Sequence, residues 1–92
     1  MTKRELAEQV TQRSQNLSRR QTEVVIDSIF GEMIRALCRG EKVEIRGFGS
    51  FKVKNRNAKQ GRNPKSGEAV DIPAKRVPFF KVGRELRGLV AG

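Results

Sequence analysis

The chain has 92 residues, of which 20 are Lys or Arg and 10 are Asp or Glu, so its formal charge is +10 at neutral pH. A chain of this length forms one domain with a modest core. Because it has no His and a single Cys, a Ser-His or Cys-His nucleophile is excluded and a zinc site is not expected, so we predict neither an enzyme nor a cofactor. The lone cysteine fits a reducing compartment, and the sequence lacks a membrane-length apolar run or a signal peptide's apolar region, which favours a cytoplasmic protein.

The first half of the chain carries two predicted helices. Thr2–Glu5 and Ser18–Gln21 both have the form of a capping box, which starts a helix. In such a box the hydroxyl of the first residue accepts from the backbone N–H of the fourth, and the Glu or Gln side chain of the fourth accepts from the backbone N–H of the first. The first helix is expected to be short. The second is expected to run to about Arg39, with Gly40 as its C-terminal stop.

The second predicted helix is apolar over an unusually wide arc. At 100° per residue, its apolar residues from Val25 to Cys38 sweep about 220° of the circumference, more than a helix needs to cover one side of a core. We therefore predict an obligate dimer without a stable monomer, a ligand-binding groove being the alternative, and expect Cys38 to be buried. The expected dimer core comprises Val25, Ile26, Ile29, Phe30, Met33, Ile34, Leu37, Phe48, Phe51, Phe79 and Phe80.

Short strands are predicted after Gly40. Val43–Ile45 alternates, and Gly47–Gly49 brings a tight reversal, because only glycine takes a positive φ without penalty. In the next strand Phe51 and Val53 share one face, while Lys52, Lys54 and Arg56 share the other. Beyond Val53 the apolar face fades and the basic face continues.

The positive charge is concentrated in this second half. Up to Ile45 eight cations face seven acids, a net +1, whereas from Arg46 onward twelve cations face three acids, a net +9. Such an asymmetry favours nucleic acid as the partner, or less often an anionic membrane surface. The membrane alternative is weaker because it requires a basic amphipathic helix, and these cations fall on an expected hairpin.

That hairpin is the stretch from Phe51 to Arg76. Its outward leg to Pro64 could reach roughly 40 Å if fully extended, and the turn at Asn63–Gly67 is rich in turn-forming residues. We predict a long basic β-hairpin arm, loosely ordered alone, that binds a polyanion. A solvated surface loop is the alternative.

Two prolines and a short helix follow the predicted arm. Pro73 and Pro78 are expected to mark the end of a strand or an edge position. The last helix is expected to turn Leu86, Leu89 and Val90 inward. A second basic face is expected from the cations spaced by three, Lys81, Arg84 and Arg87.

Three runs of residues resemble a known family. They are Ile45–Phe51, Gly61–Lys65 with Gly67 two residues on, and Val77–Lys81 with Gly83 two residues on. They resemble the bacterial HU and integration host factor proteins, and the likeness covers essentially the whole chain. The Gly-Arg-Asn-Pro-Lys run is quite specific, whereas Gly-Phe-Gly alone would be weak.

The resemblance implies an α+β fold and one domain over residues 1–92. Residues 1–40 would form the helical base of an intertwined dimer, residues 41–80 a short antiparallel β-sheet saddle with a long β-hairpin arm at about 53–75, and residues 81–92 a C-terminal helix. It also implies a nucleoid-associated architectural protein that binds the minor groove of duplex DNA and bends it, serving recombination, transcription and DNA packaging.

The resemblance assigns roles to individual residues. Pro64 matches an arm-tip proline that wedges between base pairs, which costs a few kcal/mol of unstacking repaid by added contacts; a simple turn-former is the alternative. Arg62 and Asn63 match positions in the minor groove, whose acceptors barely distinguish A·T from T·A. The other DNA contacts expected are Lys3, Lys52, Lys54, Arg56, Lys59, Lys65, Lys75, Arg76, Lys81, Arg84 and Arg87.

One further run separates the two subfamilies. Glu44–Arg46 looks like the integration host factor beta chain, in which the arginine enters the minor groove and the glutamate restrains it, so Glu44 and Arg46 join the expected site. That chain pairs with an alpha-type partner; a non-specific HU-type homodimer stays open. Val82 stands where the family commonly has a proline, which should slightly loosen the start of the last helix.

Two other binding functions compete with DNA bending. An RNA-binding module is less expected, because sequence-specific RNA modules stack bases on exposed aromatics and none lies between Phe51 and Phe79. The second competing function is that of a dimer that binds polyanions without bending them.

Overall fold

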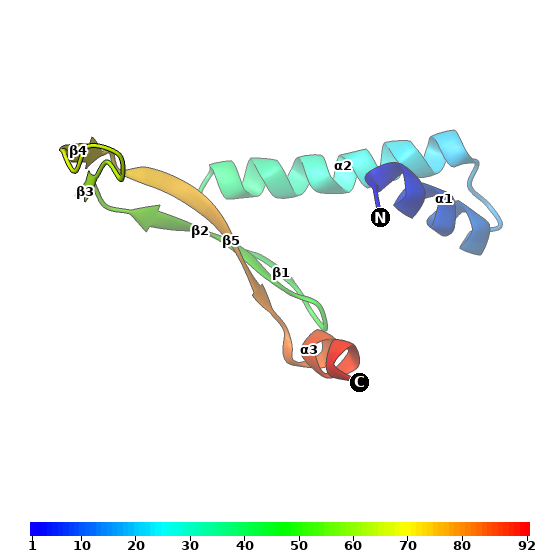
Figure 1. The fold of residues 1–92 in the computed structure, drawn as a ribbon. Helices are drawn as coiled ribbons and strands as arrows, with labels where there is room; N and C mark the ends of the chain where they lie inside the picture. The colour runs from blue at the N-terminus through cyan, green and yellow to red at the C-terminus, as the bar shows by residue number, and fades with distance from the viewer. The chain divides into compact units, whose positions relative to one another are not determined.

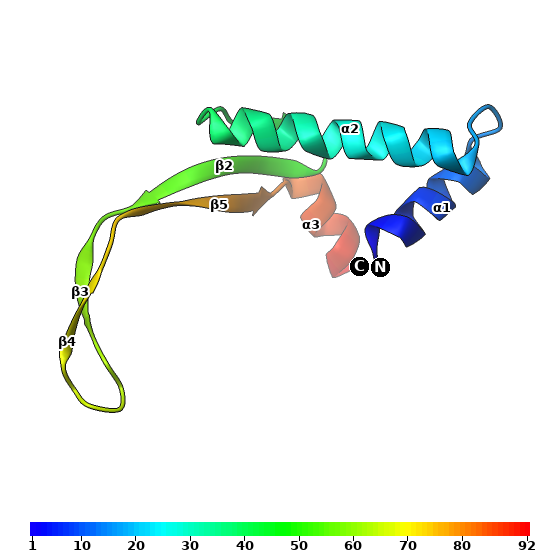
Figure 2. The same cartoon turned by 90° about the horizontal axis from the view of Figure 1, so that it is seen from above.

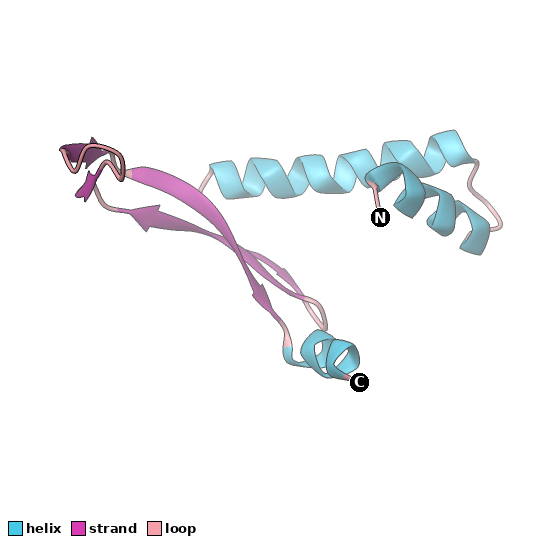
Figure 3. Cartoon of the chain, in the orientation of Figure 1, coloured by secondary structure: helices cyan, strands magenta, loops and turns pink.

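The computed structural model describes residues 1–92 as three helices and five strands (Figure 1). In chain order these are α1 (Lys3–Arg13), α2 (Arg19–Cys38), β1 (Val43–Ile45), β2 (Gly49–Arg56), β3 (Lys59–Arg62), β4 (Ala69–Ile72), β5 (Lys75–Val82) and α3 (Arg84–Ala91). Figure 3 shows the helices at both ends of the sequence and the strands between them, so the α+β class is confirmed. The chain divides into two compact units, Met1–Arg35 and Ala36–Gly92, which are described separately below.

The first unit contains α1 and most of α2, and both helices begin as predicted. The Glu5 N–H donates to Thr2 Oγ1 at 3.1 Å. The second capping box is complete, since the Gln21 N–H donates to Ser18 Oγ at 3.1 Å and the Ser18 N–H to Gln21 Oε1 at 2.9 Å. Ala7 from α1 is buried, as are Thr22 and Ile26 from α2.

Helix α2 ends as predicted, at a glycine with positive φ. Gly40 has φ +80°, and its N–H donates to the Leu37 carbonyl at 3.0 Å. The Glu41 N–H then donates to the Ala36 carbonyl at 2.9 Å. These bonds satisfy carbonyls that a helix end leaves without partners, and a left-handed residue after the helix makes them possible.

The second unit contains a three-stranded antiparallel sheet in the order β1-β2-β5. The reversal from β1 to β2 occurs where glycine was expected to allow it: Gly47 has φ +84°, and the Phe48 N–H donates to the Ile45 carbonyl at 3.0 Å. Pro78 lies in β5, opposite Val53. Because β5 is an edge strand, its proline removes no donor that a further strand would need, which agrees with the predicted edge position.

One face of this sheet is aromatic. Phe80 lies opposite Phe51, with ring centroids 4.7 Å apart, and the Phe48 ring is 5.5 Å from that of Phe80. Gly49 permits this packing, because a Cβ there would lie only 2.5 Å from Phe80 Cζ. The cluster remains partly open, with Phe48 and Phe80 each more than one-third exposed.

The strands continue into a separate two-stranded ladder, β3–β4, in which Lys59 pairs with Ile72 and Arg62 with Ala69. We call β3, β4 and their connecting turn (59–72) the arm. In Figure 2 the arm curves away from β2 and β5 and ends in an open loop. The predicted hairpin is thus interrupted, at Asn57–Ala58 on one leg and Pro73–Ala74 on the other, because proline has no N–H for the ladder.

Two expectations about burial are corrected within the chain. Leu89 and Val90 of α3 are each 79% exposed and do not turn inward, and Cys38 is exposed. The reason is that little of the chain packs over these residues: the buried hydrophobic residues are Ala7 and Ile26.

The accessible surface is correspondingly large. It amounts to 8114 Å². A compact monomer of this mass would expose about 5,400 Å². Much of the surplus is apolar, since Val25, Ile29 and Ile34 of α2 are 45%, 53% and 60% exposed. None of the helices has the length and apolar character that crossing a membrane requires.

Candidate nucleic-acid interface

The second face of the β2–β5 pair is basic. Directly opposed residues of an antiparallel pair share a face, and residues two apart along a strand share it too. The register therefore gathers Lys52, Lys54 and Arg56 of β2 with Lys75 and Lys81 of β5 on one face, together with Ser50, Val77 and Phe79. We call this set the basic face. Its five cations are all exposed. The register confirms the predicted alternation along β2, since Phe51 and Val53 lie on the other face.

One carboxylate lies at the end of this face. Glu44 of β1 is opposite Ser50, so it is on the same side as the basic face, and its Oε2 lies 3.9 Å from Lys42 Nζ. Arg46 follows directly in the turn and is exposed. The Glu44–Arg46 run thus lies beside the basic face, with the acid in the strand and the arginine in the reversal.

Arg76 is placed differently from the other predicted contacts. It pairs with Asn55 and so lies on the aromatic side of β5. Its Nη2 donates to the carbonyl oxygens of Leu37 at 3.4 Å and Cys38 at 3.3 Å, in the last turn of α2. A cation there is favoured by the partial negative charge of a helix C-terminus. Adjacent strand residues point to opposite faces, so the sequence could have indicated that Lys75 and Arg76 lie on different faces of β5.

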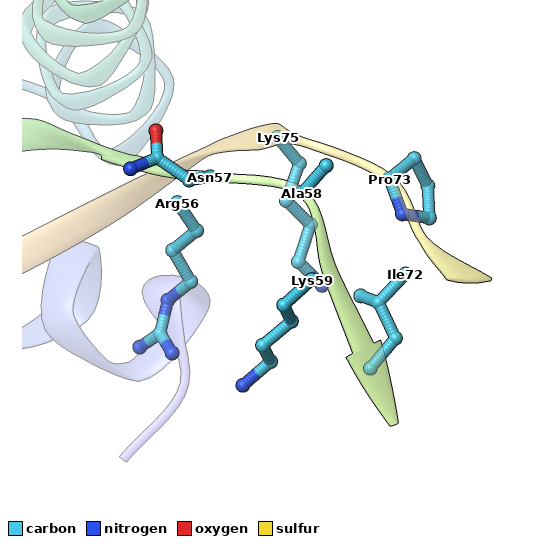
Figure 4. Close-up of a pocket in the computed structure, with 7 residues that line it drawn as sticks. All are labelled: Arg56, Asn57, Ala58, Lys59, Ile72, Pro73 and Lys75. Carbon is cyan, nitrogen blue, oxygen red and sulfur yellow. The ribbon is translucent and has the colours of Figure 1, made fainter. Parts of the chain in front are cut away.

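A positively charged hollow lies where the sheet passes into the arm. Its volume is about 440 Å³, and Figure 4 shows its lining residues. Arg56 and Lys59 extend to the same side of the ribbon in this view, and Lys75 and Pro73 complete the opposite leg. The lining includes three cations and no carboxylate, so the hollow is suited to an anionic group.

The arm tip is a compact turn that Asn63 organises. The Asn63 N–H donates to the Glu68 carbonyl at 2.9 Å, and the Gly67 N–H donates to the Asn63 carbonyl at 2.7 Å. Asn63 Oδ1 accepts from the Lys65 N–H at 2.9 Å, and the Asn63 side chain is exposed. Gly67 has φ +75°, which the turn requires, and Pro64 is exposed.

The interior of the arm is minimal. A Cβ on Gly61 would lie 2.9 Å from Ile72 Cδ1, so the isoleucine covers the glycine across the ladder. Val70 is 44% exposed. A two-stranded hairpin with so little apolar contact is marginally stable by itself.

The helical cations predicted for DNA contact are exposed. Lys3 Nζ lies 2.6 Å from Asp27 Oδ1, and the hydrogen bond and charge of Asp27 raise the pKa of Lys3. Arg84 and Arg87 lie in the first turns of α3, whose cap residue Gly83 supplies no side-chain hydrogen bond. No group of three or more Cys, Asp or Glu side chains comes together in a way that could hold a metal ion.

Phe79 was grouped with the core in the sequence analysis, and the structure places it elsewhere. It lies opposite Lys52 on the basic face, whereas Phe80 joins the aromatic cluster on the other face. The signal was available in the sequence, because adjacent strand residues point to opposite faces, so Phe79 and Phe80 lie on different faces of the sheet.

Comparison with known proteins agrees with this geometry. Residues 1–91 match the family described as bacterial DNA-binding protein. The chain therefore belongs to the bacterial DNA-binding protein family, whose HU members supply similar solved structures.

Three solved structures illustrate the likeness. The HU–DNA cocrystal structure from Anabaena is 40% identical, with a TM-score of 0.89, over 99% of this chain and 98% of that one. HU from Thermotoga maritima is 30% identical, with a TM-score of 0.69, over 98% of both chains. A mutant of transcription factor 1 is 27% identical, with a TM-score of 0.67, over 100% of this chain and 92% of that one.

Proposed function

We propose that this chain is an architectural protein that, as a dimer, binds the minor groove of duplex DNA and bends it. The observation that carries the proposal is the basic face, where five exposed cations are gathered on one side of β2 and β5. A row of cations on a pleated surface matches a phosphate backbone, which supplies most of the affinity of such proteins. The solved HU–DNA complex from Anabaena, 40% identical to this chain, supports the choice of DNA.

The arm tip would supply the bend. Pro64 is exposed at the end of the arm, between Asn63 and Lys65, and is the apolar group there. An apolar wedge inserted between base pairs unstacks them and kinks the duplex, at a cost of a few kcal/mol repaid by contacts that bent DNA allows. Arg62 and the Nδ2 donor of Asn63 would reach acceptors in the minor groove.

Phosphate contacts would surround the kink. We assign them to Lys52, Lys54, Arg56, Lys59, Lys65, Lys75, Lys81, Arg84, Arg87 and Lys3, all of which are exposed. The hollow between Arg56, Lys59 and Lys75 would take a phosphate at the root of the arm. Arg76 is the exception, because its guanidinium already donates to the end of α2.

The dimer follows from the unburied apolar surface. The chain exposes about 2,700 Å² more than a compact monomer of its mass, and α2 and α3 carry much of the apolar part. An obligate homodimer interface buries roughly 1,000 to 2,500 Å² on each chain, so a dimer interface could cover most of this surplus surface. Val25, Ile29, Phe30, Met33, Ile34 and Leu37 of α2, with Phe48, Phe51 and Phe80, would form the shared core around Ile26.

The finer assignment, to an integration host factor beta-like chain, has its own support. Glu44 lies at the end of the basic face and Arg46 in the adjoining turn, as a minor-groove arginine with a restraining carboxylate would require. Such a chain would pair with an alpha-type partner and serve recombination, transcription and nucleoid organisation. A non-specific HU-type homodimer is the second candidate, favoured by the HU structures that the chain resembles.

The test measures shape as well as binding. Duplex DNA with donor and acceptor dyes at its ends should give increased energy transfer when the protein saturates it, and the same sequence as duplex RNA should bind more weakly. Unchanged energy transfer at saturation would contradict bending, and equal binding of RNA would favour the RNA-module alternative. Native mass measurement, with and without an alpha-type chain, then separates heterodimer from homodimer.

A further inference from the structure

An aromatic side chain lies among the cations of the basic face. Phe79 is 38% exposed, and its neighbours on that face across the ladder are lysines. The ammonium nitrogen of Lys54 lies 3.7 Å from the centre of the Phe79 ring, and that of Lys52 lies 6.0 Å from it. The ring is therefore in cation–π contact with one lysine and at the outer limit of contact with another.

A role in the aromatic cluster does not account for this residue. That cluster is formed by Phe48, Phe51 and Phe80 on the opposite face, and Phe79 shares no ring contact with it. A large apolar ring at the centre of a charged surface gains little from folding, because it stays partly in water. Its cation–π contact is with Lys54, and Lys52 lies at the outer limit of such a contact.

We propose that Phe79 is a positioning residue of the DNA interface, which holds Lys54, and to a lesser degree Lys52, over the basic face before DNA arrives. The inference rests on the proposed DNA-binding function. The negative face of the ring attracts the ammonium and limits the rotamers of a long, flexible side chain. An ordered lysine has less conformational entropy to lose when a phosphate fixes it.

The contact leaves the lysine able to bind. An ammonium group has three N–H donors, and a ring on one side of it still leaves donors that face outward. Lys54 can therefore keep its place over Phe79 while it donates to a phosphate oxygen. The ring acts through the lysine and makes no bond to the nucleic acid itself.

Phe79→Leu is the informative substitution, because leucine keeps apolar bulk and lacks the aromatic ring. Phe79→Tyr keeps the ring and is the matched control. We expect Phe79→Leu to weaken duplex binding by about two- to fivefold per chain, because DNA must then bear the ordering cost of one flexible side chain, and Phe79→Tyr to bind like the parent chain. In a Lys54→Ala background, Phe79→Leu should cause little further loss.

A spectroscopic measurement on the DNA-free protein checks the geometry. The Lys54 side-chain protons should show an upfield ring-current shift, present in Phe79→Tyr and lost in Phe79→Leu. Phe80→Leu, in the aromatic cluster, should lower thermal stability without moving the Lys54 signals.

Each other outcome overturns the inference. Equal binding by the parent chain and Phe79→Leu would show that the ring orders nothing that matters for DNA. An undiminished loss in the Lys54→Ala background would make the ring a direct DNA contact. Dissociation of the dimer by Phe79→Leu would make it a core residue. If the parent chain binds no duplex, the proposed function fails; if it binds and these variants match it, only the role of Phe79 fails.

Discussion

Helix α2 and the arm both have many exposed side chains, but those of α2 are apolar and those of the arm are cationic. Helix α2 exposes aliphatic residues, among them Ile29 at 53% and Ile34 at 60%. The arm exposes Lys59, Arg62 and Lys65 and has almost no interior. Apolar surface is stabilised by another apolar surface, whereas clustered cations are stabilised by a polyanion. The two regions therefore define two partners, a second protein chain and a nucleic acid.

The largest effect is expected from a charge on the apolar arc of α2. Ile29→Asp would place a carboxylate where we propose a dimer core, and burying an unpaired charge is very costly. We expect the dimer dissociation constant to rise at least about a thousandfold, roughly 4 kcal/mol, together with loss of cooperative unfolding. Sedimentation and thermal melts measure both.

Ser28→Asp is the control for this change. Ser28 is exposed on the polar side of α2, and its hydroxyl donates to the Val24 carbonyl within the same helix. The variant adds the same charge one residue away and should leave the dimer intact. A dimeric Ile29→Asp protein would mean that the aliphatic arc has another purpose.

The second prediction concerns the arm tip. Pro64→Ala removes the proposed wedge and keeps every cation, so we expect a smaller bend and a roughly tenfold weaker affinity, about 1.4 kcal/mol, for straight duplex. Affinity for a duplex that is already kinked should change much less. Energy transfer between dyes at the duplex ends reports the bend.

Pro73→Ala provides the comparison, since Pro73 lies at the root of the arm and not at its tip. It should leave the bend close to that of the parent protein. Equal losses on straight and kinked duplexes for Pro64→Ala would count against a wedge and leave Pro64 as a turn-former.

The third prediction separates two neighbouring cations of β5. Lys75→Ala should lower the slope of log K against log salt by about 0.9 per chain, because each phosphate contact contributes that amount. Arg76→Ala should leave the slope unchanged and lower the stability of the free protein by about 0.5 kcal/mol, since its hydrogen bonds are long and exposed. Filter binding over a salt series, with melts of the free protein, measures both.

The slopes decide between the two roles. A reduced slope for Arg76→Ala would show that its guanidinium leaves α2 and joins the phosphate contacts when DNA binds. Arg76→Lys, which keeps the charge and loses the planar fork of donors, should retain the slope in either case.

The smallest effect is expected at Lys3, whose pKa Asp27 raises above the ordinary value of 10.5. A raised lysine pKa contributes stability that is fully present below the unfolded-state pKa and is lost as the pH rises through the folded-state pKa. Asp27→Asn should return the pKa of Lys3 towards 10.5, which NMR titration of the Lys3 side chain would detect. The pair is exposed, so neutral-pH stability should hardly change. An unshifted titration in Asp27→Asn would mean that Asp27 does not cause the shift.

The sequence by itself determined features that depend on local chemistry. The helix caps at Thr2 and Ser18, the stop at Gly40 and the reversal at Gly47 formed as expected, because each rests on hydrogen bonds or backbone angles within a few residues. The family resemblance also followed from sequence, since its motifs are contiguous runs.

Tertiary structure decided what depends on register and on distant contacts. The pairing of β2 with β5 placed Phe79 on the basic face, and the approach of β5 to the end of α2 gave the exposed Arg76 backbone carbonyls as hydrogen-bond partners. The break at Pro73 set where the arm begins. The charge and hydrophobicity of a side chain indicate only whether it favours water or an apolar environment. The face of the sheet on which it lies, and the residues that it contacts, depend on strand pairing between residues far apart in the chain.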